Sequence, residues 1–207
     1  CYEVSGEGTE VGGDWYDIIP VDDSRFFFVL GDVSGRGIGA ATIMARLHFA
    51  VRAYAVQDDS PEQIMGKLGH LLTIEKDGSF ATVLCALVDV PAHTVTLVNA
   101  GHPPPLLLDD GRGDYVRTTV FPPVGVQGTT PYEGSSFTVP AGGTIVAFTD
   151  GLVEKRNETI DAGLARLRDR AVGQPGDLDQ LLTTILTEST TGGYDDDTAI
   201  LAVRWTN

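Results

Sequence analysis

This chain is poor in basic residues. It has 14 lysines and arginines against 29 aspartates and glutamates, which gives its 207 residues a formal net charge of -15. Non-specific binding to nucleic acid and to anionic membrane surfaces both require a positively charged surface, so the shortage argues against both. Solubility alone explains most of the carboxylates, although the acidic balance is also compatible with an enzyme that binds divalent metal.

Cysteines and long apolar runs are also scarce. Of the two cysteines, Cys85 lies in the apolar run 80–88, which predicts a buried free thiol rather than a disulfide. There is no signal peptide and no run long enough to span a membrane, so a cytoplasmic protein is expected. With 42% hydrophobic residues, no repeat and no linker, residues 1–207 are expected to form a single domain. The start at Cys1, as if within a strand, suggests a domain excised from a longer protein.

The hydrophobic pattern changes period along the chain and predicts both strands and helices. Residues 22–24 form a turn between two strands of a hairpin, and Ser60 followed by Pro61 is typical of a helix start. Residues 121–134 are expected to be a long surface connection. The predicted strands are 2–6, 15–21, 25–33, 80–90, 94–99, 106–109, 115–118, 136–139, 144–149 and 198–205, and the predicted helices are 36–56, 60–75, 161–172 and 177–188. This order predicts an α+β layered domain in which 198–205 is a central strand.

Four aspartates stand at the edges of the strand-like runs: Asp14, Asp32, Asp150 and Asp195. An isolated buried carboxylate is costly, so such groups are usually paired or bind a metal, and no lysine or arginine matches these four. A single aspartate beside glycine is more often a turn residue. The four together predict a site for a hard divalent cation, and with it chemistry on phosphate.

Five segments in order along the chain resemble those of the metal-dependent PP2C-type protein phosphatases, in the bacterial branch that includes the SpoIIE and RsbU regulators. They are V-G-G-D-W-Y-D at 11–17, G-D-V-S-G-R-G at 31–37, N-A-G-H-P-P at 99–104, T-D-G-L-V-E at 149–154 and D-D-D-T at 195–198. The resemblance spans nearly the whole chain. It implies an α-β-β-α sandwich, with two mainly antiparallel sheets flanked by helices and the metals at one edge.

The resemblance also implies two Mn²⁺ or Mg²⁺ ions that activate a water for attack on phosphate, without a covalent enzyme intermediate. Asp32 is expected to bridge both ions and is therefore the expected catalytic residue. Asp14 and the backbone carbonyl of Val33 are expected on one ion, and Asp150 and Asp195 on the other.

Three further residues, Asp17, Ser34 and Asp196, are candidates to support these ligands by hydrogen bonding. For Asp17, hydrogen bonding within the turn is an equal alternative, and Asp196 is also a reserve ligand. His102, which precedes three prolines, is predicted to be structural and to bond the turn backbone.

Two departures from the eukaryotic relatives concern substrate handling. Those relatives carry a histidine two residues after the bridging aspartate, where this chain has Ser34, and an upstream arginine that grips phosphate, where no arginine precedes Gly12. The general acid is therefore unidentified, and proton donation falls to a metal-bound water. The substrate-binding residues are unknown, with Arg36 or the substrate protein itself as the alternatives.

The family likeness implies a serine/threonine protein phosphatase that acts on a phosphorylated regulatory protein. In the bacterial branch this substrate is typically a small anti-sigma-factor antagonist of the stress response. An upstream sensor or dimerisation domain of the full-length protein is expected to control activity through the helices 37–56 and 60–75. Neither nucleic acid nor a membrane is an expected partner.

Two other interpretations are open. G-R-G-I-G-A at 35–40 follows a strand and opens a helix, and Asp58 lies about twenty residues further on, as in a dinucleotide-binding fingerprint. That fingerprint requires the acidic residue to end a second strand, and it leaves Asp14 and Asp150 unexplained. The second alternative is a catalytically silent PP2C-like interaction or scaffold module, which measured turnover with and without metal distinguishes from an enzyme.

Overall fold

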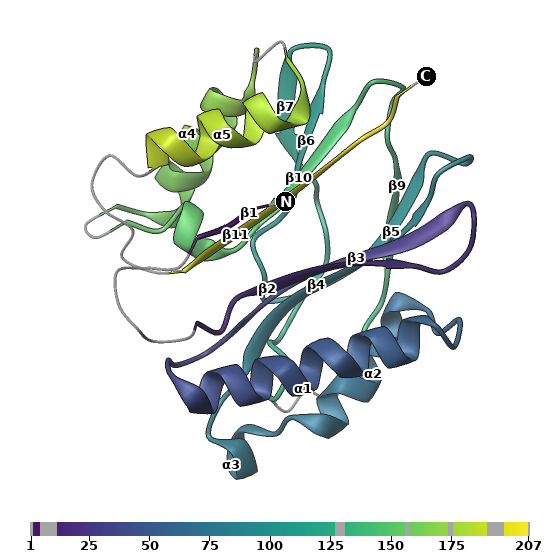
Figure 1. Ribbon diagram of the computed structural model, residues 1–207, viewed down its shortest axis with the longest axis vertical. Helices are drawn as coiled ribbons and strands as arrows, with labels where there is room; N and C mark the ends of the chain where they lie inside the picture. The colour runs from purple at the N-terminus through teal and green to yellow at the C-terminus, as the bar shows by residue number, and fades with distance from the viewer. Residues whose placement is uncertain are drawn as a thin grey trace. The chain divides into compact units, whose positions relative to one another are not determined.

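The computed structural model describes residues 2–4, 12–126, 131–155, 158–173, 176–189 and 197–206. The chain divides into two compact units. Unit 1 comprises Cys1–Gly8, Pro103–Arg117 and Val139–Asn207, and unit 2 comprises Thr9–His102 and Thr118–Thr138. Each unit contains one sheet and its own helices (Figure 1).

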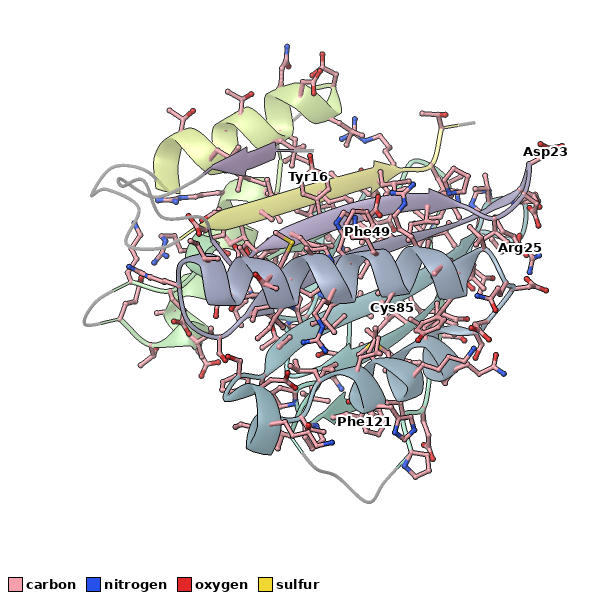
Figure 2. The ribbon with its side chains drawn as sticks, turned by 60° about the horizontal axis from the view of Figure 1, so that its bottom comes forward. Tyr16, Asp23, Arg25, Phe49, Cys85 and Phe121 are labelled. Atoms are coloured by element: carbon pink, nitrogen blue, oxygen red, sulfur yellow. The ribbon has the colours of Figure 1, made fainter. Side chains whose placement is uncertain are left out.

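Unit 2 contains a six-stranded sheet in the order β2-β3-β4-β5-β8, with β9 also paired to β5. All pairs are antiparallel except β5 with β8. Its strands are β2 (Trp15–Pro20), β3 (Arg25–Val33), β4 (Ala81–Asp89), β5 (Thr94–Ala100), β8 (Val120–Phe121) and β9 (Ser135–Thr138), and its helices are α1 (Ile38–Ala55), α2 (Pro61–Leu71) and α3 (Ile74–Asp77). The tip of the β2–β3 hairpin carries Asp23 and Arg25 (Figure 2).

Side-chain alternation decides which face of this sheet the helices cover. On β3, Phe27, Val29 and Val33 belong to the hydrophobic cluster that includes Leu47 of α1 and Ile64 of α2. Successive strand residues point to opposite faces, so Phe28, Leu30 and Asp32 lie on the face away from these helices. The predicted helix start is confirmed, because the Ser60 hydroxyl accepts from Gln63 N while Gln63 Oε1 accepts from Ser60 N at 2.8 Å.

Unit 1 contains a five-stranded antiparallel sheet in the order β1-β11-β10-β6-β7. Its strands are β1 (Tyr2–Val4), β6 (Leu106–Asp109), β7 (Arg112–Tyr115), β10 (Thr144–Phe148) and β11 (Thr198–Arg204), and its helices are η1 (Asp150–Leu152), α4 (Ile160–Ala171) and α5 (Leu178–Ser189). Val146, Phe148 and Ile200 pack with Leu167 and Ile185 of the helices. The prediction of an interior position for the last strand is confirmed, since β11 lies between β1 and β10.

The predicted fold class, α+β with two mainly antiparallel sheets and accompanying helices, is confirmed, while three local predictions were wrong. The helix predicted over 60–75 ends at Leu71, and α3 follows separately. The strand predicted over 115–118 is β7, which begins at Arg112 because Asp110 and Gly111 alone make the turn, with φ of 42° and 71°. The connection over 121–134 does not lie wholly at the surface, because Val124 is fully buried and forms an isolated β-bridge with Ala81.

No helix in the described part of the chain is both long enough and apolar enough to cross a membrane.

Candidate metal centre

Asp14 and Asp32 lie directly opposite each other on neighbouring strands of unit 2. The β2–β3 register pairs Trp15 with Gly31, and the hydrogen bond from Val33 N to Gly13 O, 3.2 Å, continues it by two residues. Positions 14 and 32 therefore form the non-hydrogen-bonded pair between them, where opposite Cα atoms are about 4.5 Å apart and side chains share one face. Like charges at such a pair repel, and a divalent cation between them would offset the repulsion.

Gly13 allows the Val33 carbonyl to approach this pair. A Cβ at position 13 would stand 2.3 Å from Val33 O and 3.0 Å from Val33 N, both of which are backbone atoms. The glycine is therefore required by close approach of two strands. It leaves a hard carbonyl oxygen beside the carboxylate positions 14 and 32.

Trp15 explains the glycine that precedes Asp32. A Cβ at Gly31 would lie 2.1 Å from the Trp15 ring atom Cη2, so the six-membered ring of the indole occupies the space beside this glycine. Trp15 is 3% exposed and belongs to the core that the helices cover. The ring locks the β2–β3 register one residue away from both carboxylates.

Ser34 holds the end of β3 in place. Its hydroxyl accepts from Phe80 N at 3.0 Å, and its own N–H donates to Phe80 O at 2.9 Å. These two bonds tie the turn after Val33 to the start of β4. Ser34 therefore supports the Val33 carbonyl through the backbone, which is consistent with the supporting role expected for it.

Unit 1 carries Asp150 at the start of the single turn η1, which Thr149 separates from the end of β10. Thr149 links this turn to β11, since Thr149 N donates to Ala199 O at 3.0 Å and Ala199 N donates to Thr149 Oγ1 at 2.8 Å. A Cβ at Gly151 would stand 2.1 Å from Asp197 O. This contact brings Asp150 close to Asp197, the residue that directly follows positions 195 and 196. Asp195 and Asp196 themselves lie outside the described residues.

The donor sets fit a hard divalent cation. Unit 2 offers two carboxylates and a backbone carbonyl, and unit 1 offers Asp150; all are the oxygen donors that Mg²⁺ and Mn²⁺ prefer. Backbone atoms come close to Gly13 in unit 2 and to Gly151 in unit 1, and these contacts position the neighbouring donor groups within each unit. Among the residues that the structure describes, no three His, Cys, Asp or Glu side chains come together as a metal-binding group.

His102 follows β5 of unit 2 and is hydrogen-bonded to residues of β5 and β4. It is 3% exposed, its backbone N–H donates to Asn99 Oδ1 at 2.8 Å, and its carbonyl accepts from Asn99 Nδ2 at 2.9 Å. Its ring Nδ1 lies 3.0 Å from the hydroxyl of Thr82, which pairs directly with Asp32 in the β3–β4 register. The turn is therefore held by Asn99, and the His102 ring contacts Thr82.

Asp17 does not make the hydrogen bonds within a turn that were considered as one alternative for it. It lies within β2 rather than in a turn, and alternation places it on the helix-covered face, opposite to Asp14 and Asp32. Its carboxylate accepts from Arg52 Nη1 at 2.7 and 2.6 Å and lies 2.8 Å from His48 Nε2. The sequence offered a signal for these partners: Asp17 alternates with apolar Trp15 and Ile19, and a buried acid there needs a cation.

The dinucleotide-binding interpretation is excluded by the topology. The fingerprint belongs to a strand–helix–strand unit with parallel strands, whereas β3 and β4 are antiparallel neighbours. Asp58 lies between α1 and α2 and pairs with Arg25 at 3.2 Å. Gly35 and Gly37, with φ of 100° and 80°, instead make the turn that leads from Val33 into α1.

Comparison with solved structures defines the class of this fold as that of the PP2C phosphatase domains. A crystal structure of the RsbU and RsbW domains of Rv1364c from Mycobacterium tuberculosis superposes with a TM-score of 0.87 at 30% identity, covering 98% of this chain and 58% of that one. A structure of the PP2C phosphatase domain and a fragment of the regulatory domain of SpoIIE from Bacillus subtilis gives a TM-score of 0.86 at 17% identity, covering 99% of this chain and 62% of that one.

Residues 22–206 match the sequence model of the family described as "Stage II sporulation protein E (SpoIIE)", and the chain belongs to this family. Phosphoserine phosphatase RsbP from Bacillus subtilis (strain 168) is 29% identical over 151 residues, which cover 70% of this chain and 38% of RsbP. The chain thus spans less than two thirds of the length of RsbP and of the Rv1364c chain.

Proposed function

We propose that this domain is a divalent-metal-dependent phosphatase that hydrolyses phosphoserine or phosphothreonine on a regulatory protein. The observation that carries the proposal is the pairing of positions 14 and 32 across β2 and β3, beside the Val33 carbonyl, in a chain of the SpoIIE family. RsbP, a relative by sequence, is named a phosphoserine phosphatase.

The proposed ligands are those that the family resemblance assigns. Asp32 would hold both of two Mn²⁺ or Mg²⁺ ions, Asp14 and the carbonyl of Val33 would hold one of them, and Asp150 and Asp195 would hold the other. Two such ions, when bound, activate a water as nucleophile and neutralise the phosphoryl oxygens.

The residues around the ligands keep the donor atoms in position. Gly13 and Gly31 permit the close approach of β2 and β3, and Trp15 covers Gly31 and keeps water from the strand pair there. Ser34 fixes the backbone that carries the Val33 carbonyl. These are positioning roles, and they explain why glycine, tryptophan and serine flank the aspartates in the sequence.

The proposed substrate is a small phosphorylated anti-sigma-factor antagonist. The Rv1364c structure combines an RsbU domain with an RsbW domain, which supports a role in that kind of regulatory system. A sensor or dimerisation domain elsewhere in the full-length protein would control activity through α1 and α2. These helices follow directly from Asp32 and Val33, so a shift of α1 would move both ligands.

The test is hydrolysis of p-nitrophenyl phosphate and of a phosphoserine protein across a Mn²⁺ titration. Asp32→Ala should abolish turnover, whereas Asp14→Ala should recover partly at high Mn²⁺ because it removes a ligand from one ion only. Asp23→Ala, an exposed aspartate at the tip of the β2–β3 hairpin, is the control and should behave as wild type.

The outcomes separate the alternatives. Equal rescue of both ligand variants would contradict the bridging role of Asp32. Mn²⁺ binding by calorimetry without turnover of either substrate would favour the catalytically silent interaction module. If the protein neither binds Mn²⁺ nor turns over either substrate, the proposed function is refuted.

A further inference from the structure

Asp17 is a charged group within the interface between α1 and the sheet of unit 2. Its side chain is 11% exposed, and its neighbours on the same face of β2, Trp15 and Ile19, belong to the hydrophobic core. Both carboxylate oxygens accept from Arg52, and one also contacts His48, so two residues one helical turn apart hold one acid. The His48 ring in turn stacks on Phe49, with ring centroids 5.7 Å apart.

The strand that carries Asp17 needs such an anchor. In the part of the chain that the structure describes, β2 is an edge strand and pairs with β3 alone, so backbone hydrogen bonds hold it from one side. Asp14 immediately precedes its first residue, where strands fray most readily. The position of Asp14 opposite Asp32 therefore depends on how firmly the six residues of β2 stay in register.

We infer that Asp17, Arg52 and His48 form a positioning anchor that keeps β2 in register and thereby keeps Asp14 facing Asp32. The effect on metal binding rests on the proposed function, whereas the effect on β2 does not. Asp17 lies on the opposite face from the ligand carboxylates, so it acts through the strand and does not touch the metal.

An ion pair specifies geometry here in a way that apolar packing would not. A shift of β2 by one residue would turn Asp17 to the other face, away from both partners. A rotation of α1 by one residue would likewise carry Arg52 and His48 off the carboxylate. The Asp17 carboxylate is 11% exposed, so removing a partner would leave a largely buried charge with less compensation, and this favours one relative position of the two elements.

The anchor also couples both ligand strands to the same helix. The N-terminal end of α1 follows the turn after Asp32 and Val33, and the last turn of α1 contains Arg52. α1 is therefore joined covalently to one ligand strand and by an ion pair to the other. Any force that moves α1 along the sheet acts on Asp32 and Asp14 together.

The experiment compares Arg52→Gln with Arg46→Gln, a matched variant on the same helix. The two arginine side chains are similarly exposed, at 47% and 49%, but Arg46 binds Asp77 and the Leu71 carbonyl instead of a carboxylate on β2. The readouts are hydrogen exchange of the β2 amides in metal-free protein and Mn²⁺ affinity by calorimetry. Arg52→Lys, which keeps the charge, is the conservative variant.

We expect Arg52→Gln to speed exchange in β2 and to weaken Mn²⁺ binding by about 10-fold or more. Arg46→Gln should leave both readouts near the wild-type values, and Arg52→Lys should restore part of each. The inference would be overturned if Arg52→Gln left both the Mn²⁺ affinity and the β2 exchange unchanged. It would also be overturned if Arg52→Gln and Arg46→Gln had equal effects. A third outcome is that the wild-type protein binds no Mn²⁺ while Arg52→Gln still speeds hydrogen exchange in β2. That result would uphold the anchor and refute the proposed function instead.

Discussion

Replacement of Gly13 by alanine tests whether close approach of β2 and β3 builds the ligand pair. The added Cβ would meet Val33 O at 2.3 Å, whereas ordinary contact begins at 3.4 Å. The obstructing atoms belong to the backbone, so no side-chain rotation relieves the overlap. The strands must separate by about 1 Å at this point, which is enough to lose much of the local packing energy.

The expected magnitude follows from two contributions. Overpacking of a tight site typically costs about 1–3 kcal/mol. The strand separation also weakens the hydrogen bond from Val33 N to Gly13 O, whose net value is about 0.5–1.5 kcal/mol. We therefore expect Gly13→Ala to lower the free energy of unfolding by about 2–4 kcal/mol. Because Asp14 is the next residue, Mn²⁺ affinity should fall by about 10-fold or more.

The assay is urea unfolding with and without Mn²⁺, together with calorimetric titration of the metal. The control is Gly39→Ala in the first turn of α1, where an added Cβ meets no heavy atom within 4 Å. This variant should be stabilised by about 0.5–1 kcal/mol, because alanine suits a helix better than glycine. A Gly13→Ala protein with wild-type stability and Mn²⁺ affinity would refute the argument from close approach.

Three further predictions concern other parts of the chain. Gly151→Ala should destabilise the turn after β10 and weaken binding of the second Mn²⁺ equivalent, because its Cβ would lie 2.1 Å from Asp197 O; unchanged two-site calorimetry would contradict this. In a Cys1→Ser background, a thiol reagent should not react with folded protein, because burial raises the pKa of the Cys85 thiol; rapid labelling without denaturant would show the burial to be wrong. Hydrogen bonds from the turn backbone hold the pKa of Asp22 well below its usual range. Its contribution to stability should therefore be present above the unfolded pKa of about 3.9 and disappear as pH falls through the lower folded pKa, so the difference in Tm between wild type and Asp22→Asn should shrink in acid. A pH-independent difference would argue against that assignment.

Local signals in the sequence were sufficient for most elements. The Ser60-Pro61 start of α2, the hairpin around residues 22–24 and the strand Leu106–Asp109 were all predicted where the structure has them. These features depend on residues within a few positions of one another, through capping, turn geometry and alternation. Element ends were less accurate, because tertiary packing decides whether a helix such as α2 continues past Leu71.

The family motifs located the candidate ligands, but the sequence did not indicate which contacts keep these ligands in position. Glycine at 13 and 31 was visible as a motif, whereas the reason for each glycine is a Val33 carbonyl and a Trp15 ring on a neighbouring strand. The partners of Asp17 were not predicted for the same reason. Its partners lie 31 and 35 residues further along the chain, on a helix whose orientation follows from packing.

The sequence by itself determined the family, the strand and helix pattern and the aspartates at the strand ends, because each is written in short-range residue patterns. The tertiary structure alone decided that positions 14 and 32 face each other, that Asp17 faces α1 and that Gly151 lies against Asp197. Those relations depend on strand register and on the docking of helices to sheets. Both are set by contacts between residues far apart in the chain, which no local pattern encodes.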